Sequence, residues 1–195
     1  MPANLKLTGD IAIDTEAMGL HNYRDRLCVV QLSNGDGNAH LVQFERGQYE
    51  APNLKKLLLD VQTTKIFHFA RFDVSIMRYY LGVLTQPIYC TRTASKLART
   101  YTDRHGLKDL CRELLGKEIS KQQQSSDWGS KELSAEQKEY AAGDVLYLHQ
   151  LRTLLDAMLV REGRFELAQA CFNFIPARAL LDLAGWAEAD IFAHE

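Results

Sequence analysis

Two carboxylates spaced two residues apart, Asp14 and Glu16, are the first candidates for chemistry in this sequence. They end residues 9–16, GDIAIDTE, an apolar run that predicts a β-strand. Side chains two apart on a strand point to the same face, roughly 7 Å apart along the backbone. Two such carboxylates repel each other unless a cation lies between them. The pair is therefore a candidate metal site, although taken alone an acidic pair at a strand end is often only structural.

A second pair, Tyr140 and Asp144, is spaced four residues apart and so shares one face of a predicted helix. Ser134 and Gln137 form a capping-box pattern that marks the start of this helix. Its apolar stripe, which predicts one long helix, consists of Ala141, Val145, Leu148, Leu151, Leu155 and Met158. An acid beside such a stripe costs free energy unless it is paired or binds a cation. The structural alternative is a core tyrosine and an acid solvated at the edge of the core.

A third acid, Asp73, follows residues 65–69, a short run that predicts a strand. It lies near the start of a predicted helix, residues 73–81, which ends at Gly82. Asp73 is interpreted either as part of the same metal site or as an acid that favours the helix dipole. His68 is interpreted as a core or neighbouring histidine rather than a metal ligand.

The composition sets limits on the class of protein. The 195 residues suit one domain, and 46% hydrophobic with 25% charged residues is ordinary for a soluble globular protein. We expect no secretory signal and no membrane partner, because the N-terminus lacks an apolar run and charges interrupt every longer apolar stretch. The four cysteines are widely spaced, which predicts reduced thiols in a cytoplasmic protein and argues against a zinc site.

The charge is distributed unevenly along the chain. The net charge is -2, whereas proteins that grip long nucleic acids usually have a basic surface. Residues 92–121, however, contain eight Lys or Arg and four acids. A local basic patch beside an acidic remainder suits a short anionic substrate and a metal site. The alternative is an ordinary solvated helical face.

These candidate residues need a scaffold, and the pattern of elements predicts an α/β fold. Residues 27–32 and 40–44 predict two strands separated by the turn SNGDGN, so the first three strands favour an antiparallel meander. A helix is predicted over residues 53–61, and several more through Lys117. Strands first, then alternating strands and helices, predict a mixed sheet flanked by helices. Residues 163–195 predict a C-terminal helical extension whose apolar side chains offer an oligomer interface. Those side chains are Phe172, Phe174, Trp186, Ile191 and Phe192.

The order and spacing of the three acidic motifs resemble the DEDD exonuclease superfamily, in the tyrosine-bearing branch that includes ribonuclease D. The stretches IFHFARFD, YTDRHGLKDLCRELLG, ISKQQQSSDW and LDLAGWAEADIFAHE are similar to the nanoRNase C (NrnC-type) oligoribonucleases, short bacterial relatives of ribonuclease D. The resemblance implies a ribonuclease H-like exonuclease fold, with residues 1–195 as a single domain that lacks the helical HRDC modules. It further implies 3′→5′ hydrolysis of short oligoribonucleotides, especially dinucleotides, to 5′-mononucleotides, and a homo-octamer.

The resemblance also implies roles for individual residues. Asp14, Glu16, Asp73 and Asp144 would hold two divalent cations, Mg²⁺ or Mn²⁺, with Asp14 bridging them; carboxylate oxygens prefer these hard ions. Tyr140 would orient the attacking water. Leu20, four residues after Glu16, would wedge between the last two bases. The alternative is that Leu20 is a core leucine. The other predicted substrate contacts, some of them suited to a 5′ phosphate, are Thr15, His68, Arg99, Tyr101, Arg104, His105, Lys121 and Gln124.

Three rival functions remain open from the sequence. The first is ribonuclease D-like trimming of longer RNA 3′ ends, which the acidic net charge and the expected lack of accessory modules disfavour. The second is a DNA 3′→5′ exonuclease, because no residue identifies a sensor for the RNA 2′-hydroxyl. The third is a nucleic-acid-binding module without activity, which the complete set of four acids and Tyr140 disfavours.

Overall fold

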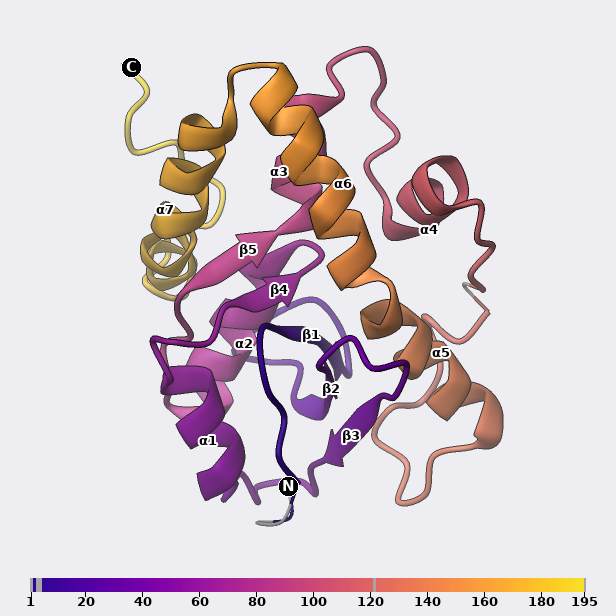
Figure 1. The fold of residues 1–195 in the computed structure, drawn as a ribbon. Coiled ribbons are helices and arrows are strands. Elements are labelled where there is room, and N and C mark those ends of the chain that lie inside the picture. The colour runs from indigo at the N-terminus through magenta and orange to yellow at the C-terminus, as the bar shows by residue number, and fades with distance from the viewer. Residues whose placement is uncertain (1, 3–4, 121, 195) are drawn as a thin grey trace.

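The fold is organised around a mixed β-sheet, seen in the computed structural model, which describes residues 2, 5–120 and 122–194 (Figure 1). Within these residues the sheet has five strands in the order β3-β2-β1-β4-β5. The strands are β1 (Ile11–Ala17), β2 (Leu27–Ser33), β3 (His40–Gln43), β4 (Lys65–Phe67) and β5 (Ile88–Cys90). The first three strands pair antiparallel and form the predicted meander, whereas β4 pairs parallel with both β1 and β5. The predicted mixed sheet is thus confirmed.

Helices cover both faces of this sheet (Figure 1). They are α1 (Pro52–Leu59), α2 (Ala70–Leu81), α3 (Thr91–Ala98), α4 (Leu107–Leu110), the π-helical turn η1 (Cys111–Leu115), α5 (Ala135–Leu146), α6 (Leu148–Arg161) and α7 (Phe165–Leu183). Helix α5 packs on β1, β2 and β3, and α6 packs on β4. Helix α2 packs on β2, β4 and β5, with α7 against it. No helix in the described ranges is both long and apolar enough to cross a membrane.

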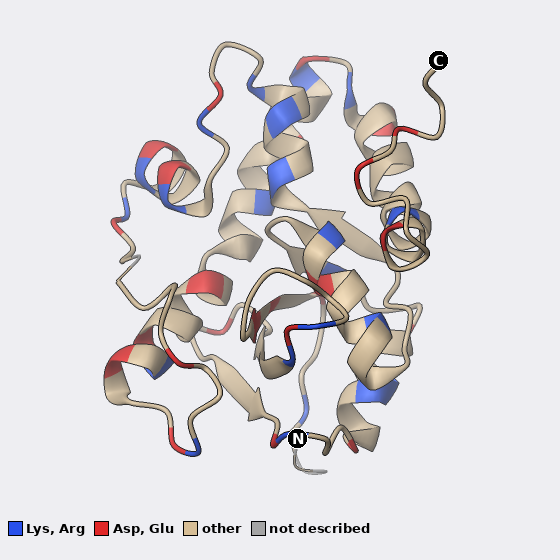
Figure 2. Ribbon diagram, turned by 180° about the vertical axis from the view of Figure 1, so that it is seen from behind, with Lys and Arg blue, Asp and Glu red and all other residues tan. Residues whose placement is uncertain are grey.

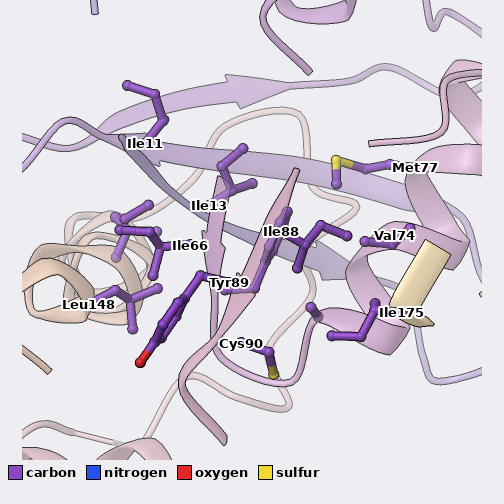
Figure 3. Close-up of a cluster of buried hydrophobic side chains, with 14 of the residues drawn as sticks. Ile11, Ile13, Ile66, Val74, Met77, Ile88, Tyr89, Cys90, Leu148 and Ile175 are labelled. Carbon is purple, nitrogen blue, oxygen red and sulfur yellow. The ribbon is translucent and has the colours of Figure 1, made fainter. Parts of the chain in front are cut away.

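The main core lies between these layers and follows the alternation of the strands. In Figure 3, Leu148 of α6 lies beside Ile66 and Tyr89, whereas Val74 of α2 lies on the side to which Ile88 points. All five side chains are buried. Because both faces of β4 and β5 are covered, these short strands hold α2 and α6 at fixed positions relative to β1.

The start of α5 is fixed by the predicted capping box. The Ser134 hydroxyl accepts a hydrogen bond from the Gln137 backbone N–H at 3.2 Å, and the Gln137 side-chain oxygen accepts one from the Ser134 N–H at 2.9 Å. This satisfies two donors that a helix start otherwise leaves unpaired. The prediction of one long helix is wrong, however, because the chain bends at Tyr147 (φ −104°, ψ −5°). Helix α5 follows β1 and β2 while α6 packs on α3, a change of partner that apolar spacing does not report.

Other boundaries also differ from the predictions. The strand predicted over residues 65–69 ends at Phe67, and α2 begins at Ala70, three residues earlier than expected. Strand β5 was not predicted, because its three residues, Ile88–Cys90, are too short to show a period. Within residues 163–195, α7 ends at Leu183 and is followed by a non-helical stretch up to residue 194.

Candidate active site

Strand β1 and helix α5 bring three of the predicted acids together. Asp14 and Glu16 lie on the same face of β1, and α5 packs over that strand with Asp144 on its third turn. One carboxylate oxygen from each of the three lies within 4.8 Å of the other two. Residues 14 and 144 are 130 positions apart, so only the tertiary fold creates this cluster.

The fourth acid, Asp73, reaches the same cleft from the first turn of α2. It is buried, and the Thr15 hydroxyl donates a hydrogen bond of 2.6 Å to its Oδ1. Thr15 was predicted as a substrate contact. In the structure its hydroxyl orients Asp73. Alternation along β1 therefore places Asp14 and Glu16 towards α5, and Thr15 towards α2.

Burial and mutual repulsion make these carboxylates hard to ionise. Burial, then the nearby Asp73 and Asp144, raises the pKa of Asp14 well above its ordinary value. The same causes raise the pKa of Glu16 to about 9, and burial raises the pKa of Asp73 to about 7. Positive charge at this point would let all of them ionise. A set of carboxylate oxygens this close together fits a hard divalent cation such as Mg²⁺ or Mn²⁺.

Tyr140 faces the same cleft one helical turn before Asp144. Burial, followed by the charge of Asp144, raises the pKa of its phenol above the ordinary value of 10. The hydroxyl therefore stays protonated at neutral pH and acts as a hydrogen-bonding group rather than a base. The indole of Trp128 packs against its ring, with centroids 5.9 Å apart.

The cleft that contains the acids has a volume of about 630 Å³. Of the predicted substrate contacts, Thr15, Leu20, His68 and Gln124 line it. Leu20 is 84% exposed, so the alternative of a core leucine is wrong. His68 Nδ1 lies 2.9 Å from the Thr91 hydroxyl, which orients the ring.

Four predicted substrate contacts, Arg99, Tyr101, Arg104 and His105, are not among the residues that line this cleft. The Arg99 side chain is fully buried, forms an ion pair with Glu113 and donates to the Arg104 carbonyl at 2.9 Å. His105 Nδ1 lies 2.8 Å from the Ser95 hydroxyl. These residues brace the turn after α3. Lys121 lies outside the described residues.

Sequence reasoning missed several residues that line the cleft. Arg92 and Lys108 supply basic groups, and Phe69 and Phe72 supply aromatic rings. The Arg92 guanidinium lies 4.6 Å from the centroid of the Phe69 ring, a cation–π contact. The run of basic residues signalled Arg92 and Lys108 only as a group, and Figure 2 shows Lys and Arg interspersed with acids rather than gathered in one stripe. No pattern signalled Phe69, which adopts a left-handed backbone (φ 75°).

Comparison with known proteins agrees with this fold. A family model described as 3′-5′ exonuclease matches residues 1–160. The chain therefore belongs to the 3′-5′ exonuclease family, and the predicted ribonuclease H-like exonuclease fold is confirmed.

Within that family, the chain is a ribonuclease D-like protein similar to NrnC. The structure of Brucella melitensis NrnC bound to pGG is 58% identical, covers 97% of this chain and 92% of that chain, and has a TM-score of 0.94. Brucella melitensis NrnC with bound Mg²⁺ is 57% identical at the same coverage, with a TM-score of 0.93. Ribonuclease D of Gluconacetobacter diazotrophicus is 36% identical over 156 residues, which are 80% of this chain. The match spans only 39% of the length of that ribonuclease D.

Proposed function

We propose that this chain hydrolyses short oligoribonucleotides, dinucleotides above all, from the 3′ end to 5′-mononucleotides. Two divalent cations, Mg²⁺ or Mn²⁺, would be held by Asp14, Glu16, Asp73 and Asp144. The observation that carries the proposal is the convergence of three carboxylates within 4.8 Å of one another, with Asp73 in the same cleft. Divalent cations there supply charge neutralisation for the phosphoryl oxygens and a more acidic water.

The protein's own groups would then orient the substrate and the attacking water. Tyr140 donates its hydroxyl hydrogen bond to the water, since its raised pKa keeps it protonated. The Thr15 hydroxyl holds Asp73 in place through its 2.6 Å hydrogen bond. Leu20, exposed at the rim, inserts between the two bases of the substrate.

The preference for short substrates is supported by the size and charge of the cleft. About 630 Å³ admits few nucleotides, and Arg92 and Lys108 are the basic residues that line it within the described ranges. Few phosphates can be neutralised at once, so a long RNA gains little additional affinity. The NrnC structure with pGG supports a substrate of this kind.

We further propose that the chain assembles into a homo-octamer in the cytoplasm. Phe174, Trp186, Ile191 and Phe192 are 40–76% exposed, a set of apolar side chains that favours an interface. Phe172, predicted to join them, is buried against Tyr89 instead, with ring centroids 4.6 Å apart. All four cysteines lie within the described residues as free thiols, which favours a reducing compartment. Light scattering at micromolar concentration tests the assembly, and a monomer would contradict it.

A substrate panel tests the proposed activity. We expect kcat/KM with Mn²⁺ to be at least about tenfold higher on a 5′-phosphorylated diribonucleotide than on a 24-mer RNA. Equal values would favour the alternative of ribonuclease D-like trimming of longer RNA ends. Faster cleavage of an oligodeoxyribonucleotide than of an RNA of the same length would favour a DNA exonuclease. No cleavage of any substrate would contradict the proposal.

A further inference from the structure

The loop before α5 contributes to the lining of the acidic cleft, and its described residues, 116–120 and 122–134, form no helix or strand. Gln124, Ser125 and Ser126 of this loop line the same cleft as the β1 acids. A loop without regular structure needs specific contacts to hold a fixed position. Arg26 donates to the Gly129 carbonyl at 2.9 Å and Gln43 donates to the Ser130 carbonyl at 2.8 Å, and Trp128 is buried in the core. The side chain of Gln137 supplies the contacts from α5, directly beside residues 124–126.

Gln137 lies in the first turn of α5 and is only 7% exposed. Its amide nitrogen donates to the Ser126 hydroxyl at 3.0 Å and to the Asp127 carbonyl at 3.1 Å. Its amide oxygen accepts from the Ser134 N–H at 2.9 Å. The side chain thus has two separable roles: the oxygen caps the helix, and the nitrogen holds the loop.

The same helix carries two of the proposed site residues. Tyr140 and Asp144 follow Gln137 by three and seven positions, so all three lie along one side of α5. The loop touches this side a second time through Trp128, whose ring packs on that of Tyr140. Any shift of the loop base relative to α5 would therefore change the distance between the loop and the acids.

We propose that Gln137 is a positioning residue that holds the cleft loop, residues 124–126, in register with Tyr140 and Asp144. This inference rests on the proposed function, because it assigns the loop a part in binding the oligonucleotide. A loop that grips substrate acts equally on the ground state and the transition state, so its loss raises KM and leaves kcat little changed.

A pair of variants separates loop positioning from helix capping. Gln137→Glu keeps an oxygen for the Ser134 N–H, since glutamate serves equally well at this position of a capping box. It replaces the donor to the Asp127 carbonyl with a second oxygen, which that carbonyl repels. Ser134→Ala does the reverse: it removes the cap and leaves both loop contacts of Gln137 intact. Gln137→Met, which removes both roles without adding charge, checks that any effect of Gln137→Glu does not come from its negative charge.

Steady-state kinetics on a 5′-phosphorylated diribonucleotide with Mg²⁺ form the first test, with thermal denaturation alongside. We expect Gln137→Glu and Gln137→Met to raise KM about tenfold, the effect of losing one or two hydrogen bonds, with kcat within about threefold. Ser134→Ala should lower Tm without raising KM. An unchanged KM in Gln137→Glu, or an equal rise in Ser134→Ala, would overturn the inference.

Amide hydrogen exchange of the full chain gives a second readout that does not depend on catalysis. In Gln137→Glu, amides of residues 122–130 should exchange faster while those of α5 keep wild-type rates. Unchanged exchange in the loop would overturn the positioning role. A different outcome separates the two proposals. If the loop exchanges faster in Gln137→Glu but the wild-type protein cleaves no dinucleotide, the positioning role stands and the proposed function fails.

Discussion

Two buried charged regions of this molecule differ in how their charge is balanced. In the cleft, Asp14, Glu16 and Asp73 have raised pKa values, since they are half-buried or buried and lie close to other carboxylates. At the turn after α3, the buried Arg99 is balanced by Glu113 and by the Arg104 carbonyl. Both regions are rich in charged residues that the sequence made candidates for the site, yet only the first lines the cleft.

The difference teaches how to distinguish a binding site from a structural contact. Buried charges of one sign destabilise the fold unless a ligand compensates them, so they persist where a ligand binds. A buried charge that the protein already balances has no such requirement. The acidic cluster should therefore affect activity more than stability, and the Arg99 cluster should do the opposite.

The largest effect is expected from Asp14→Asn. We expect kcat on a diribonucleotide to fall by at least about 1,000-fold, because a carboxylate that would hold the cations is lost. In EDTA the variant should be at least as stable as wild type, since it removes a carboxyl group that folding makes hard to ionise. Asp73→Asn and Asp144→Asn should lose activity in the same way. A variant that keeps more than about a tenth of wild-type kcat would show that its acid is not essential.

Arg99→Met should produce the opposite pattern. Removing one partner of a buried ion pair costs about 3 kcal/mol, which in a chain of this length lowers Tm by roughly 6–12 °C. Activity below the melting temperature should stay within about threefold of wild type. Arg104→Met, whose exposed side chain is adjacent, is the matched control and should melt close to wild type. If Arg99→Met lost activity but kept its Tm, Arg99 would belong to the substrate site.

The sequence predicted features that depend on neighbouring residues, and it did not predict features that depend on tertiary packing. Period-two spacing placed Asp14 and Glu16 on one face of β1, and the capping box located the start of α5, because both signals are local. The meander and the mixed sheet followed from the order of elements. The burial of Arg99 could not be predicted, because a basic residue in a basic run looks the same whether it faces solvent or Glu113. Arg92 and Phe69 reach the cleft only through tertiary packing.

Tyr140→Phe should have a smaller effect than loss of an acid. We expect kcat to fall about 30-fold with KM nearly unchanged, because the hydroxyl acts on the attacking water and not on bound substrate. The ring, and its packing against Trp128, remains in place in this variant. An unchanged kcat would remove Tyr140 from the proposed mechanism.

The last expected effect is a pH dependence of stability in the metal-free protein. The pKa of Glu16 rises from 4.5 to about 9 and that of Asp73 from 3.8 to about 7 on folding. At a pH between the unfolded and folded pKa values of each group, the folded protein binds more protons than the unfolded chain. The free energy of unfolding therefore falls as pH rises from about 5 to 9. Mg²⁺ should reverse this trend, because it replaces those protons.

Thermal denaturation at pH 6 and pH 8.5, with EDTA or with Mg²⁺, measures this dependence. Glu16→Gln removes one of the titrating groups and should flatten the curve obtained in EDTA. If the free energy of unfolding in EDTA increased from pH 6 to pH 8.5, the raised pKa values of Glu16 and Asp73 would be contradicted.

The most direct test of the account is the number of divalent cations that bind per chain. Calorimetric titration of Mn²⁺ into the protein saturated with an uncleavable diribonucleotide analogue measures this number. We predict two Mn²⁺ per chain in wild type and fewer than two in Asp14→Asn. One ion or none in wild type, or two in Asp14→Asn, would contradict a two-cation site built on Asp14.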